Sequence, residues 1–194
     1  MTSRTLKAGL RTERLVLRDA MASEARAAAS LKMREFGGNA IEIEPGQIVS
    51  GFSPIRSEVD IRPLMEQLGA RGARLCVPAI LDKTTIVFRE LVPGAPLVDT
   101  GFGTTGPGDD APVVDPDIML VPLAAFDRTG HRIGYGAGYY DRAIDLLHRK
   151  GRQPRLIGIA FDCQEVASVP AEPHDVALDA VLTESGLRVL NGNW

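Results

Sequence analysis

Cysteine, aromatic residues and long apolar runs are all scarce in this sequence. Its two cysteines, Cys76 and Cys163, lie in strand-like apolar runs and match no metal-binding spacing. No apolar run approaches the ~18 residues that a membrane-spanning helix requires, and residues 1–21 lack the uninterrupted apolar core of a secretory signal. These absences argue against an integral membrane protein and predict a protein of the reducing cytoplasm.

The composition is that of an ordinary globular domain. Of the 194 residues, 44% are apolar and 24% are charged, and the chain contains no internal repeat. This balance excludes a disordered chain, a fibrous repeat and a coiled coil. A chain of this length buries enough surface to fold without covalent staples, so we expect residues 1–194 to form one domain.

The charge is unevenly distributed along the chain. Residues 1–34 hold eight basic and three acidic side chains, whereas the remaining 160 residues hold 14 basic and 22 acidic ones. The acidic body argues against a nucleic-acid-binding module, which needs a basic surface with interleaved aromatic residues. The basic segment indicates either an anion-binding lip or simple docking onto the body, and charge alone leaves both open.

Residues 1–36 are expected to form a helical arm. One stripe of its first helix is apolar and consists of Leu6, Leu10, Leu17 and Met21. Another stripe is basic, typical of a solvated face, and consists of Lys7, Arg11, Arg14 and Arg18. A second helix is expected from a Ser23 cap to about Phe36, before a loop at Gly37 and Gly38.

After the arm, short apolar runs alternate with helical segments. Helices closed by glycine are expected over residues 61–72 and 139–151. Strands are expected over residues 47–52, 74–80, 84–91, 118–121, 156–161 and 180–183. This alternation predicts a three-layer α/β/α fold with a mostly parallel sheet. Residues 93–116, with five prolines and five glycines, are expected to form a long loop that acts as a lid or binding wall.

The densest candidate for chemistry is FDRTGHRIGYGAGYYDR, residues 126–142. It holds all three tyrosines and three alternating glycines directly before an expected helix. A glycine-rich turn at a helix N-terminus presents free backbone N–H groups and a positive dipole end, which suits phosphate. Arg132 and Arg142 flank the turn, and a carboxylate beside phosphates, here Asp141, is typical of Mg²⁺ binding.

Simpler interpretations exist for the same residues. An acidic side chain such as Asp141 favours a helix start without any ligand. The chain lacks the Gly-Lys-Ser/Thr of a Walker A motif, and about a dozen residues separate the glycines from the preceding strand. A dinucleotide fingerprint needs its glycines directly after the strand, so a nicotinamide-dependent oxidoreductase is not indicated.

Two further segments carry candidate residues. Ser53 and Glu58 follow an expected strand, where ligands bind in parallel sheets, although Glu58 and Asp60 would equally serve to start the next helix. Near the end of the chain, His174 and Asp175 could hold a metal, and a surface turn explains them as well.

Residues 116–142, PDIMLVPLAAFDRTGHRIGYGAGYYDR, resemble the signature of 5-formyltetrahydrofolate cyclo-ligases, also called methenyltetrahydrofolate synthetases. Further segments resemble this family in the same order along nearly the whole chain: KAGLR (7–11), FSPIRSEVD (52–60), LCVP (75–78), EPHD (172–175) and LDAVLTE (178–184). Two departures stand out, Gly106-Pro107 in place of a frequent Glu-Pro and Ala137 in place of a frequent Gly or Lys.

The resemblance implies a Rossmann-like sheet of the CoA-transferase-like type and an enzyme that uses ATP and Mg²⁺ to cyclise 5-formyltetrahydrofolate. It assigns catalysis to Glu58, Arg132 and Asp141. It assigns ATP to Lys7, Arg11, Arg132, Gly134, Tyr135, Gly136, Ala137, Gly138, Tyr139 and Tyr140. It assigns the folate to Ser53, Glu58 and Tyr135–Tyr139, and the metal to Asp141 and Asp175.

The implied partners are small molecules, with neither nucleic acid nor membrane, and the expected state is a monomer or weak homodimer. A non-catalytic folate- or nucleotide-binding relative of the same fold is the alternative. Such a relative would be expected to have lost Glu58, Asp141 or the Lys7–Arg11 basic pair, and all of these are present.

Overall fold

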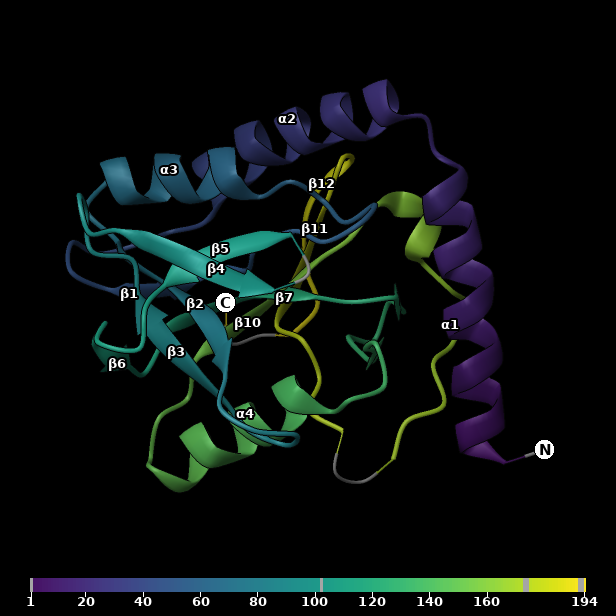
Figure 1. Cartoon of the computed structure of the whole chain (residues 1–194). Coiled ribbons are helices and arrows are strands. Elements are labelled where there is room, and N and C mark those ends of the chain that lie inside the picture. The colour runs from purple at the N-terminus through teal and green to yellow at the C-terminus, as the bar shows by residue number, and fades with distance from the viewer. Residues whose placement is uncertain (1, 102, 173–174, 192–193) are drawn as a thin grey trace.

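A central eight-stranded sheet forms the middle layer of the structure, a computed structural model that describes residues 2–101, 103–172, 175–191 and 194 (Figure 1). The strand order is β12-β11-β10-β7-β1-β2-β3-β6. The parallel strands are β1 (Ile48–Ser50), β2 (Arg74–Ile80), β7 (Ile118–Pro122), β10 (Arg155–Ile159) and β11 (Ala180–Thr183). The antiparallel strands at the two edges are β3 (Ile86–Glu90), β6 (Val113–Val114) and β12 (Gly186–Val189). The predicted mostly parallel α/β sheet is therefore confirmed.

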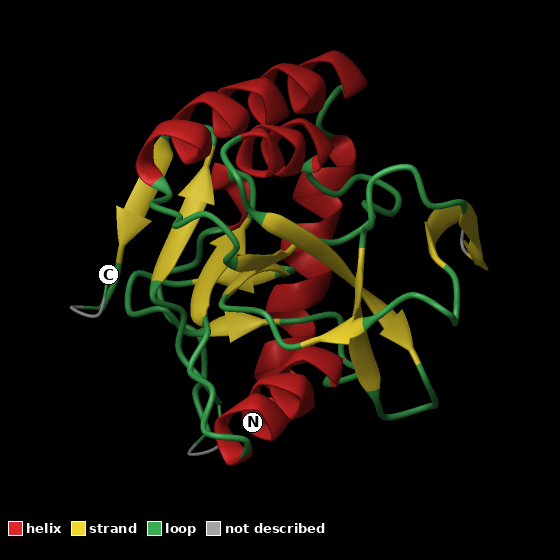
Figure 2. Ribbon diagram, turned by 90° about the vertical axis from the view of Figure 1, so that its left-hand side faces the viewer, coloured by secondary structure: helices red, strands yellow, loops and turns green. Residues whose placement is uncertain are grey.

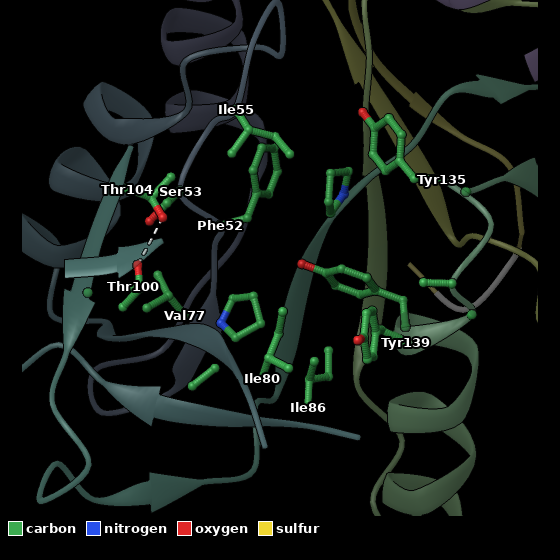
Figure 3. Close-up of a pocket in the computed structure, with 18 of the residues that line it drawn as sticks. Phe52, Ser53, Ile55, Val77, Ile80, Ile86, Thr100, Thr104, Tyr135 and Tyr139 are labelled. Atoms are coloured by element: carbon green, nitrogen blue, oxygen red, sulfur yellow. Dashed lines mark hydrogen bonds between the residues drawn. The ribbon is translucent and has the colours of Figure 1, made fainter. Parts of the chain in front are cut away.

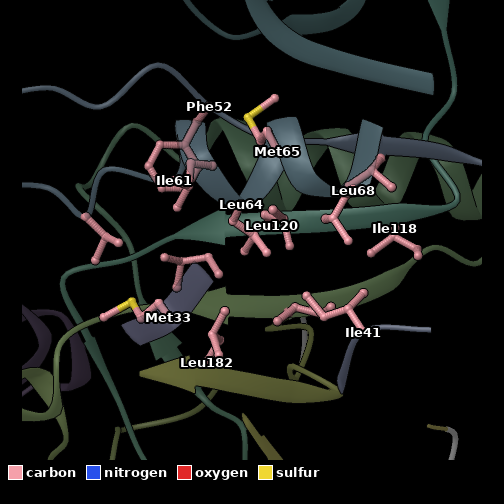
Figure 4. Close-up of a cluster of buried hydrophobic side chains, with 14 of the residues drawn as sticks. Met33, Ile41, Phe52, Ile61, Leu64, Met65, Leu68, Ile118, Leu120 and Leu182 are labelled. Atoms are coloured by element: carbon pink, nitrogen blue, oxygen red, sulfur yellow. The ribbon is translucent and has the colours of Figure 1, made fainter. Parts of the chain in front are cut away.

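Helices cover both faces of this sheet. The helices α2 (Ser23–Ala40) and α3 (Arg62–Ala70) lie on one face, and α4 (Tyr139–Arg149) lies on the other (Figures 1 and 2). Apolar side chains of α2 and α3 pack on β7, β10 and β11, with Met33, Leu64, Leu120 and Leu182 at the centre (Figure 4). On the other face, Ile144 and Leu147 of α4 are buried against the sheet. Each face thus excludes water from its strands, as the continuous apolar runs predicted.

The start and end of α2 differ from the prediction. Ser23 is the first helical residue, Ala22 takes the N-cap position, and no side chain caps the helix there. The expected loop at Gly37 and Gly38 is also wrong, because both glycines are buried inside α2. A Cβ atom on Gly37 would lie only 2.8 Å from Leu182 Cδ2 and 3.1 Å from Leu64 Cδ1. The glycine therefore serves the close approach of α2 to the core.

The first helix, α1 (Ser3–Ala20), crosses the carboxyl ends of the parallel strands instead of joining either helical layer (Figure 1). The apolar stripe is divided: Leu6 and Leu17 are 41% and 43% exposed, whereas Leu10 and Met21 are partly buried against apolar clusters of the body. Arg18, in contrast, is only 4% exposed. The interpretation of the basic stripe as a solvated face is wrong, because these side chains find acceptors on the body.

The segment expected as one long loop contains extended structure. The hairpin of β4 (Leu97–Gly101) and β5 (Thr104–Pro107) projects from the body (Figure 2), and β6 adds to the sheet edge. A smaller hairpin joins β8 (Ala125–Phe126) to β9 (Arg132–Ile133), and a short 3₁₀ helix, η1 (Asp162–Gln164), packs against α1. No helix in the described ranges is long and apolar enough to span a bilayer.

The sheet topology creates a crevice beside β1. From β1 the chain proceeds to β2 on one side, whereas β7 and then β10 are placed on the other side. At such a switch point the loops after adjacent strands diverge and leave a space at the carboxyl ends. The loops that follow β1 and β7 meet this space.

Two glycines allow a matched test of the fold. Gly130, between β8 and β9, has φ +89°, and an added Cβ would lie 2.7 Å from the Leu178 carbonyl oxygen. We expect Gly130→Ala to lower the free energy of unfolding by about 1–3 kcal/mol. The control, Gly9→Ala in α1, meets no atom within 4 Å, and we expect it to stabilise by about 0.5–1 kcal/mol. Urea denaturation measures both, and equal effects would contradict this account.

Candidate active site

A cavity of about 970 Å³ occupies the crevice at the carboxyl ends of the parallel strands. All residues that the family resemblance assigned to catalysis, ATP, folate or metal line it: Lys7, Arg11, Ser53, Glu58, Arg132, Gly134, Tyr135, Gly136, Ala137, Gly138, Tyr139, Tyr140, Asp141 and Asp175. These residues come from α1, from the loop after β1, from the segment between β9 and α4, and from the loop before β11. The structure thus brings these assigned residues together, while the ligand that each one contacts stays a prediction. Arg142, which the sequence placed beside the phosphate turn, is not among the described lining residues.

The glycine loop, residues 134–138, forms one wall of the cavity and leads into α4. Gly136 and Gly138 have φ angles of +103° and +68°, and Gly138 is the N-cap of α4. These left-handed conformations turn the chain sharply, and the first turn of α4 then has backbone N–H groups that no preceding carbonyl can reach. Arg11 of α1 closes over the loop and donates from Nε to the Gly134 carbonyl oxygen at 2.7 Å.

Two short ion pairs hold the charged end of the cavity, and Lys7 Nζ lies 4.0 Å from Glu172 Oε2 in a third, longer one. Lys7 Nζ lies 2.5 Å from Asp175 Oδ2, and Arg132 Nη2 lies 2.5 Å from Asp141 Oδ1. The Arg132 side chain is 6% exposed and also donates to the Val176 carbonyl oxygen. Burial lowers the pKa of Arg132, and the negative charges of Asp141 and Asp175 oppose this shift. The cations nominated for phosphate and the carboxylates nominated for the metal are therefore each other's partners.

The carboxylates do not form a metal cluster on their own. Within the described ranges, no group of three His, Cys, Asp or Glu side chains is arranged to hold an ion. Asp141 and Asp175 pair with two different cations, although both line the same cavity. His174 lies outside the described residues. A cation here would need ligands from a bound molecule in addition to these carboxylates.

The turn after β1 places Glu58 at the cavity and Asp60 away from it. Glu58 Oε2 accepts a hydrogen bond from the Ile55 N–H at 2.9 Å. Asp60 accepts from the Arg62 N–H at 3.1 Å and pairs with the Arg62 side chain, so the helix-start interpretation holds for Asp60. Ser53 Oγ donates to the Thr105 carbonyl oxygen at 3.3 Å, which ties the same turn to the β4–β5 hairpin.

The loop tyrosines supply neutral hydroxyl groups. Burial raises the pKa of Tyr135 well above its usual value, and the nearby negative charge of Glu58 adds to this. Burial and the Glu58 charge likewise raise the pKa of Tyr140. The Tyr140 hydroxyl is buried without a hydrogen-bond partner among the described residues. A neutral phenol in this position can donate a hydrogen bond to a ligand in the cavity.

The wall opposite the tyrosines is apolar. Figure 3 shows Phe52, Ile55 and Val77 across the cavity from Tyr135 and Tyr139. The β4–β5 hairpin completes this wall with Val98, Thr100 and Gly106. Residues 93–116 were expected to form a lid or a binding wall, and the hairpin is the part of this segment that forms a wall. Gly106 packs on Thr100, whose Cγ2 would lie 3.1 Å from an added Cβ.

Two contacts around the cavity were not predicted from the sequence. Arg142 donates from Nε to the Thr84 carbonyl oxygen at 2.5 Å and from Nη2 to the Ala137 carbonyl oxygen at 2.6 Å, so it joins the β2–β3 turn to the glycine loop. Arg18 contacts the Tyr135 hydroxyl from α1. Both arginines were visible as basic residues, but their acceptors are backbone carbonyl groups or distant side chains, which leave no sequence signal.

One end of the cavity is therefore charged, with its cations paired to carboxylates, and the other end is apolar, at the switch point of a doubly covered parallel sheet. This arrangement is that of an α/β protein with a ligand-binding cavity at the carboxyl edge of its parallel sheet.

Comparison with known proteins narrows this class. The model of the 5-formyltetrahydrofolate cyclo-ligase family matches residues 3–184. A 5-formyltetrahydrofolate cyclo-ligase of Escherichia coli K12 is 35% identical over 143 residues, which cover 71% of this chain and 78% of that protein. The NMR structure of a 5,10-methenyltetrahydrofolate synthetase of Aquifex aeolicus superposes with a TM-score of 0.81 at 27% identity, covering 97% of this chain and 95% of that one. A synthetase of the same name from Mycoplasma pneumoniae superposes with a TM-score of 0.73 at 25% identity, covering 92% and 98%.

The chain belongs to the 5-formyltetrahydrofolate cyclo-ligase family, as its motifs predicted, and it is an enzyme of folate one-carbon metabolism.

Phosphate binding at the charged end of the cavity can be tested without assuming any nucleotide. We expect tripolyphosphate to raise the melting temperature, and we expect its affinity to fall about tenfold or more in Lys7→Met and in Arg11→Met, since a charge-assisted hydrogen bond contributes about 1.5–3 kcal/mol. Arg149→Met is the control, because Arg149 pairs with Asp145 at the far end of α4. Isothermal titration with tripolyphosphate measures the affinities. Undiminished binding in both variants would return Lys7 and Arg11 to a purely docking role.

Proposed function

We propose that this enzyme cyclises 5-formyltetrahydrofolate to 5,10-methenyltetrahydrofolate with ATP and Mg²⁺, releasing ADP and phosphate. The single observation that carries the proposal is the presence of Glu58, the glycine loop and the Lys7, Arg11 and Arg132 cations in one cavity. The family match supports the folate substrate. We further expect the enzyme to act in the cytoplasm as a monomer or weak homodimer.

The chemistry explains why a phosphoryl donor is needed. The N5-formyl group is an amide, so resonance deactivates its carbonyl carbon and its oxygen is a poor leaving group. Attack of the formyl oxygen on the γ-phosphorus of ATP forms an O–P bond and releases ADP, giving an imidate phosphate. N10 then attacks the activated carbon, the C–O bond breaks, inorganic phosphate leaves, and N10 loses its proton. The product contains the N5–C–N10 bridge of the methenyl compound.

The charged end of the cavity suits the phosphoryl transfer. Lys7, Arg11 and Arg132 would bind the phosphates and stabilise the negative charge that develops on the transferred group. The backbone N–H groups of the glycine loop and of the first turn of α4 would add uncharged donors. Bound Mg²⁺ would neutralise phosphate charge as a Lewis acid, and Asp141 and Asp175 are the side chains that would hold it.

The other end suits the folate. Glu58 would accept hydrogen bonds from pterin N–H groups, and its backbone neighbours hold it in place through the Ile55 N–H. Tyr135 and Tyr139 would stack on the ring or donate hydrogen bonds. Ser53 lies in the same turn, beside the hairpin that closes the apolar wall. These contacts would direct the formyl group toward the glycine loop.

Turnover is the direct test of the function. Purified enzyme with ATP, Mg²⁺ and 5-formyltetrahydrofolate should produce the near-ultraviolet absorbance of the methenyl product, and omission of either ATP or Mg²⁺ should abolish it. Binding of both substrates without product would overturn the proposal and support the non-catalytic relative.

Glu58→Gln separates the folate role from a general role in the cavity. The amide keeps the shape but turns one acceptor oxygen into a donor, so it mismatches a ligand N–H group. We expect about a tenfold or greater loss of folate affinity, in line with about 1.5–3 kcal/mol for a charged hydrogen bond. Isothermal titration should find ATP affinity within twofold of wild type. Equal losses for both ligands would contradict the assignment of Glu58 to the folate.

The two short ion pairs predict an exchange of partners at the phosphate end. Arg132 now pairs with Asp141, and Lys7 pairs with Asp175. When phosphate binds the two cations, it competes with both carboxylates for them and lies near their negative charge, unless Mg²⁺ is bound as well. Metal-free ATP should therefore bind weakly, because it must compete with the carboxylates and face their repulsion.

Asp141→Asn tests this exchange. The variant keeps the shape but removes one negative charge, so we expect metal-free ATP to bind about tenfold more tightly and the Mg²⁺ complex of ATP to bind more weakly. Isothermal titration in EDTA and in excess Mg²⁺ measures the two affinities. Asp145→Asn, one turn further along α4 and paired with Arg149, is the control. If Asp141 only stabilises the helix start, both affinities will stay unchanged.

A further inference from the structure

Arg18 is a buried arginine that joins three separate parts of the molecule. It lies in the last turn of α1 and is 4% exposed. Its Nε donates to Ser57 Oγ at 2.9 Å, and its Nη1 donates to the Tyr135 hydroxyl at 2.6 Å. Its guanidinium carbon also lies 5.6 Å from the centre of the Tyr135 ring. One side chain thus links α1, the turn after β1 and the glycine loop.

Both acceptors of Arg18 adjoin the candidate folate site. Ser57 directly precedes Glu58, and its hydroxyl donates onward to Asp19. Tyr135 lies close enough to Glu58 for that carboxylate to raise the tyrosine pKa. Tyr135 also donates to the Leu123 carbonyl oxygen at 3.3 Å, which anchors it to the segment after β7. Arg18 itself is not among the described residues that line the cavity.

The turn that Arg18 contacts needs external support. Arg56, the residue before Ser57, has φ +55°, a left-handed conformation that non-glycine residues rarely adopt. Such a conformation persists where surrounding contacts hold it. A buried guanidinium in turn requires acceptors with fixed geometry, since an unpaired buried charge is strongly destabilising. Arg18 and the Ser53–Glu58 turn therefore constrain each other.

We propose that Arg18 is a positioning residue for the folate. Through its hydrogen bond to Ser57 it fixes the position of the neighbouring Glu58 carboxylate, and through its hydrogen bond to Tyr135 it fixes the part of the glycine loop that faces Glu58. This inference rests on the proposed function. The planar fork of arginine reaches two acceptors in different directions, and the single ammonium group of lysine reaches only one of them well. The positioning role of Arg18 thus depends on the shape of the guanidinium group as well as on its positive charge.

The test compares Arg18→Met with Arg14→Met. Arg14 lies one turn earlier on the same helix face and donates to the Cys163 carbonyl oxygen, away from the cavity. We expect both variants to melt at a lower temperature. Only Arg18→Met should raise KM for 5-formyltetrahydrofolate, by tenfold or more, while KM for ATP should rise much less, because the Lys7, Arg11 and Arg132 cations remain. Direct titration of 5-formyltetrahydrofolate without ATP should show the same loss of affinity.

Two milder variants cover the case in which Arg18→Met does not fold. Arg18→Lys should recover part of the folate affinity, and Tyr135→Phe, which removes one of the two acceptors, should lose less of it than Arg18→Met. A folate affinity of Arg18→Lys equal to wild type, or equal losses for folate and ATP, would overturn the positioning role. A wild-type enzyme that makes no methenyl product would instead overturn the proposed function, and the folate titration would still decide the role of Arg18.

Discussion

The polar docking of α1 onto the carboxyl ends of the strands is the constraint on which the cavity depends. Lys7, Arg11, Arg14 and Arg18 of this helix all make polar contacts with the body, beside the apolar contact of Leu10. Burying such cations is unfavourable unless each finds an acceptor. The arrangement in the structure satisfies all four, because Asp175, the Gly134 carbonyl, the Cys163 carbonyl and Ser57 meet these side chains. The same contacts fix the glycine loop and the Glu58 turn relative to each other.

The sheet topology supplies the space that these contacts surround. Because β1 and β7 are adjacent but their following loops diverge, a cavity opens exactly where the chain can bring loops from both halves together. The apolar wall comes from the turn after β1, from β2 and from the β4–β5 hairpin. The charged wall comes from α1, β9, the first turn of α4 and the loop before β11. A ligand pair with one phosphate-rich member and one flat ring fits this division, as the proposed substrates do.

Charge compensation within the cavity explains how such a site stays folded before ligands bind. Arg132 is almost fully buried, and Asp141 together with the Val176 carbonyl satisfies it. The carboxylates that pair with Arg132 and Lys7 are also the groups with which the proposed ligands would compete. At this end of the cavity, the same side chains therefore contribute to the stability of the fold and to ligand binding. In the apolar core beneath it, side-chain packing contributes to stability only.

Several features were determined by local sequence. The strands 74–80 and 180–183 were predicted to the residue. Residues 180–183 are buried throughout and form a continuous apolar run, whereas in 74–80 only Cys76 and Val77 are buried. The glycine loop and the start of α4 at Tyr139 were also predicted, because tight turns and helix termini favour particular residues, here the glycines before the helix. The short strands β4, β5, β6, β8, β9 and β12 were missed, because their pairing depends on partner strands more than on their own residues.

Only the tertiary structure decided which way the helices face. The spacing of Lys7, Arg11, Arg14 and Arg18 places them on one face of α1, but it does not say whether water or protein covers that face. Their acceptors lie far along the chain, such as Gly134 and Cys163, and most are backbone groups that every residue carries. The loop predicted at Gly37 was wrong for the same reason. A glycine that is needed for close packing against Leu182 cannot be distinguished, in the sequence, from a glycine that ends a helix.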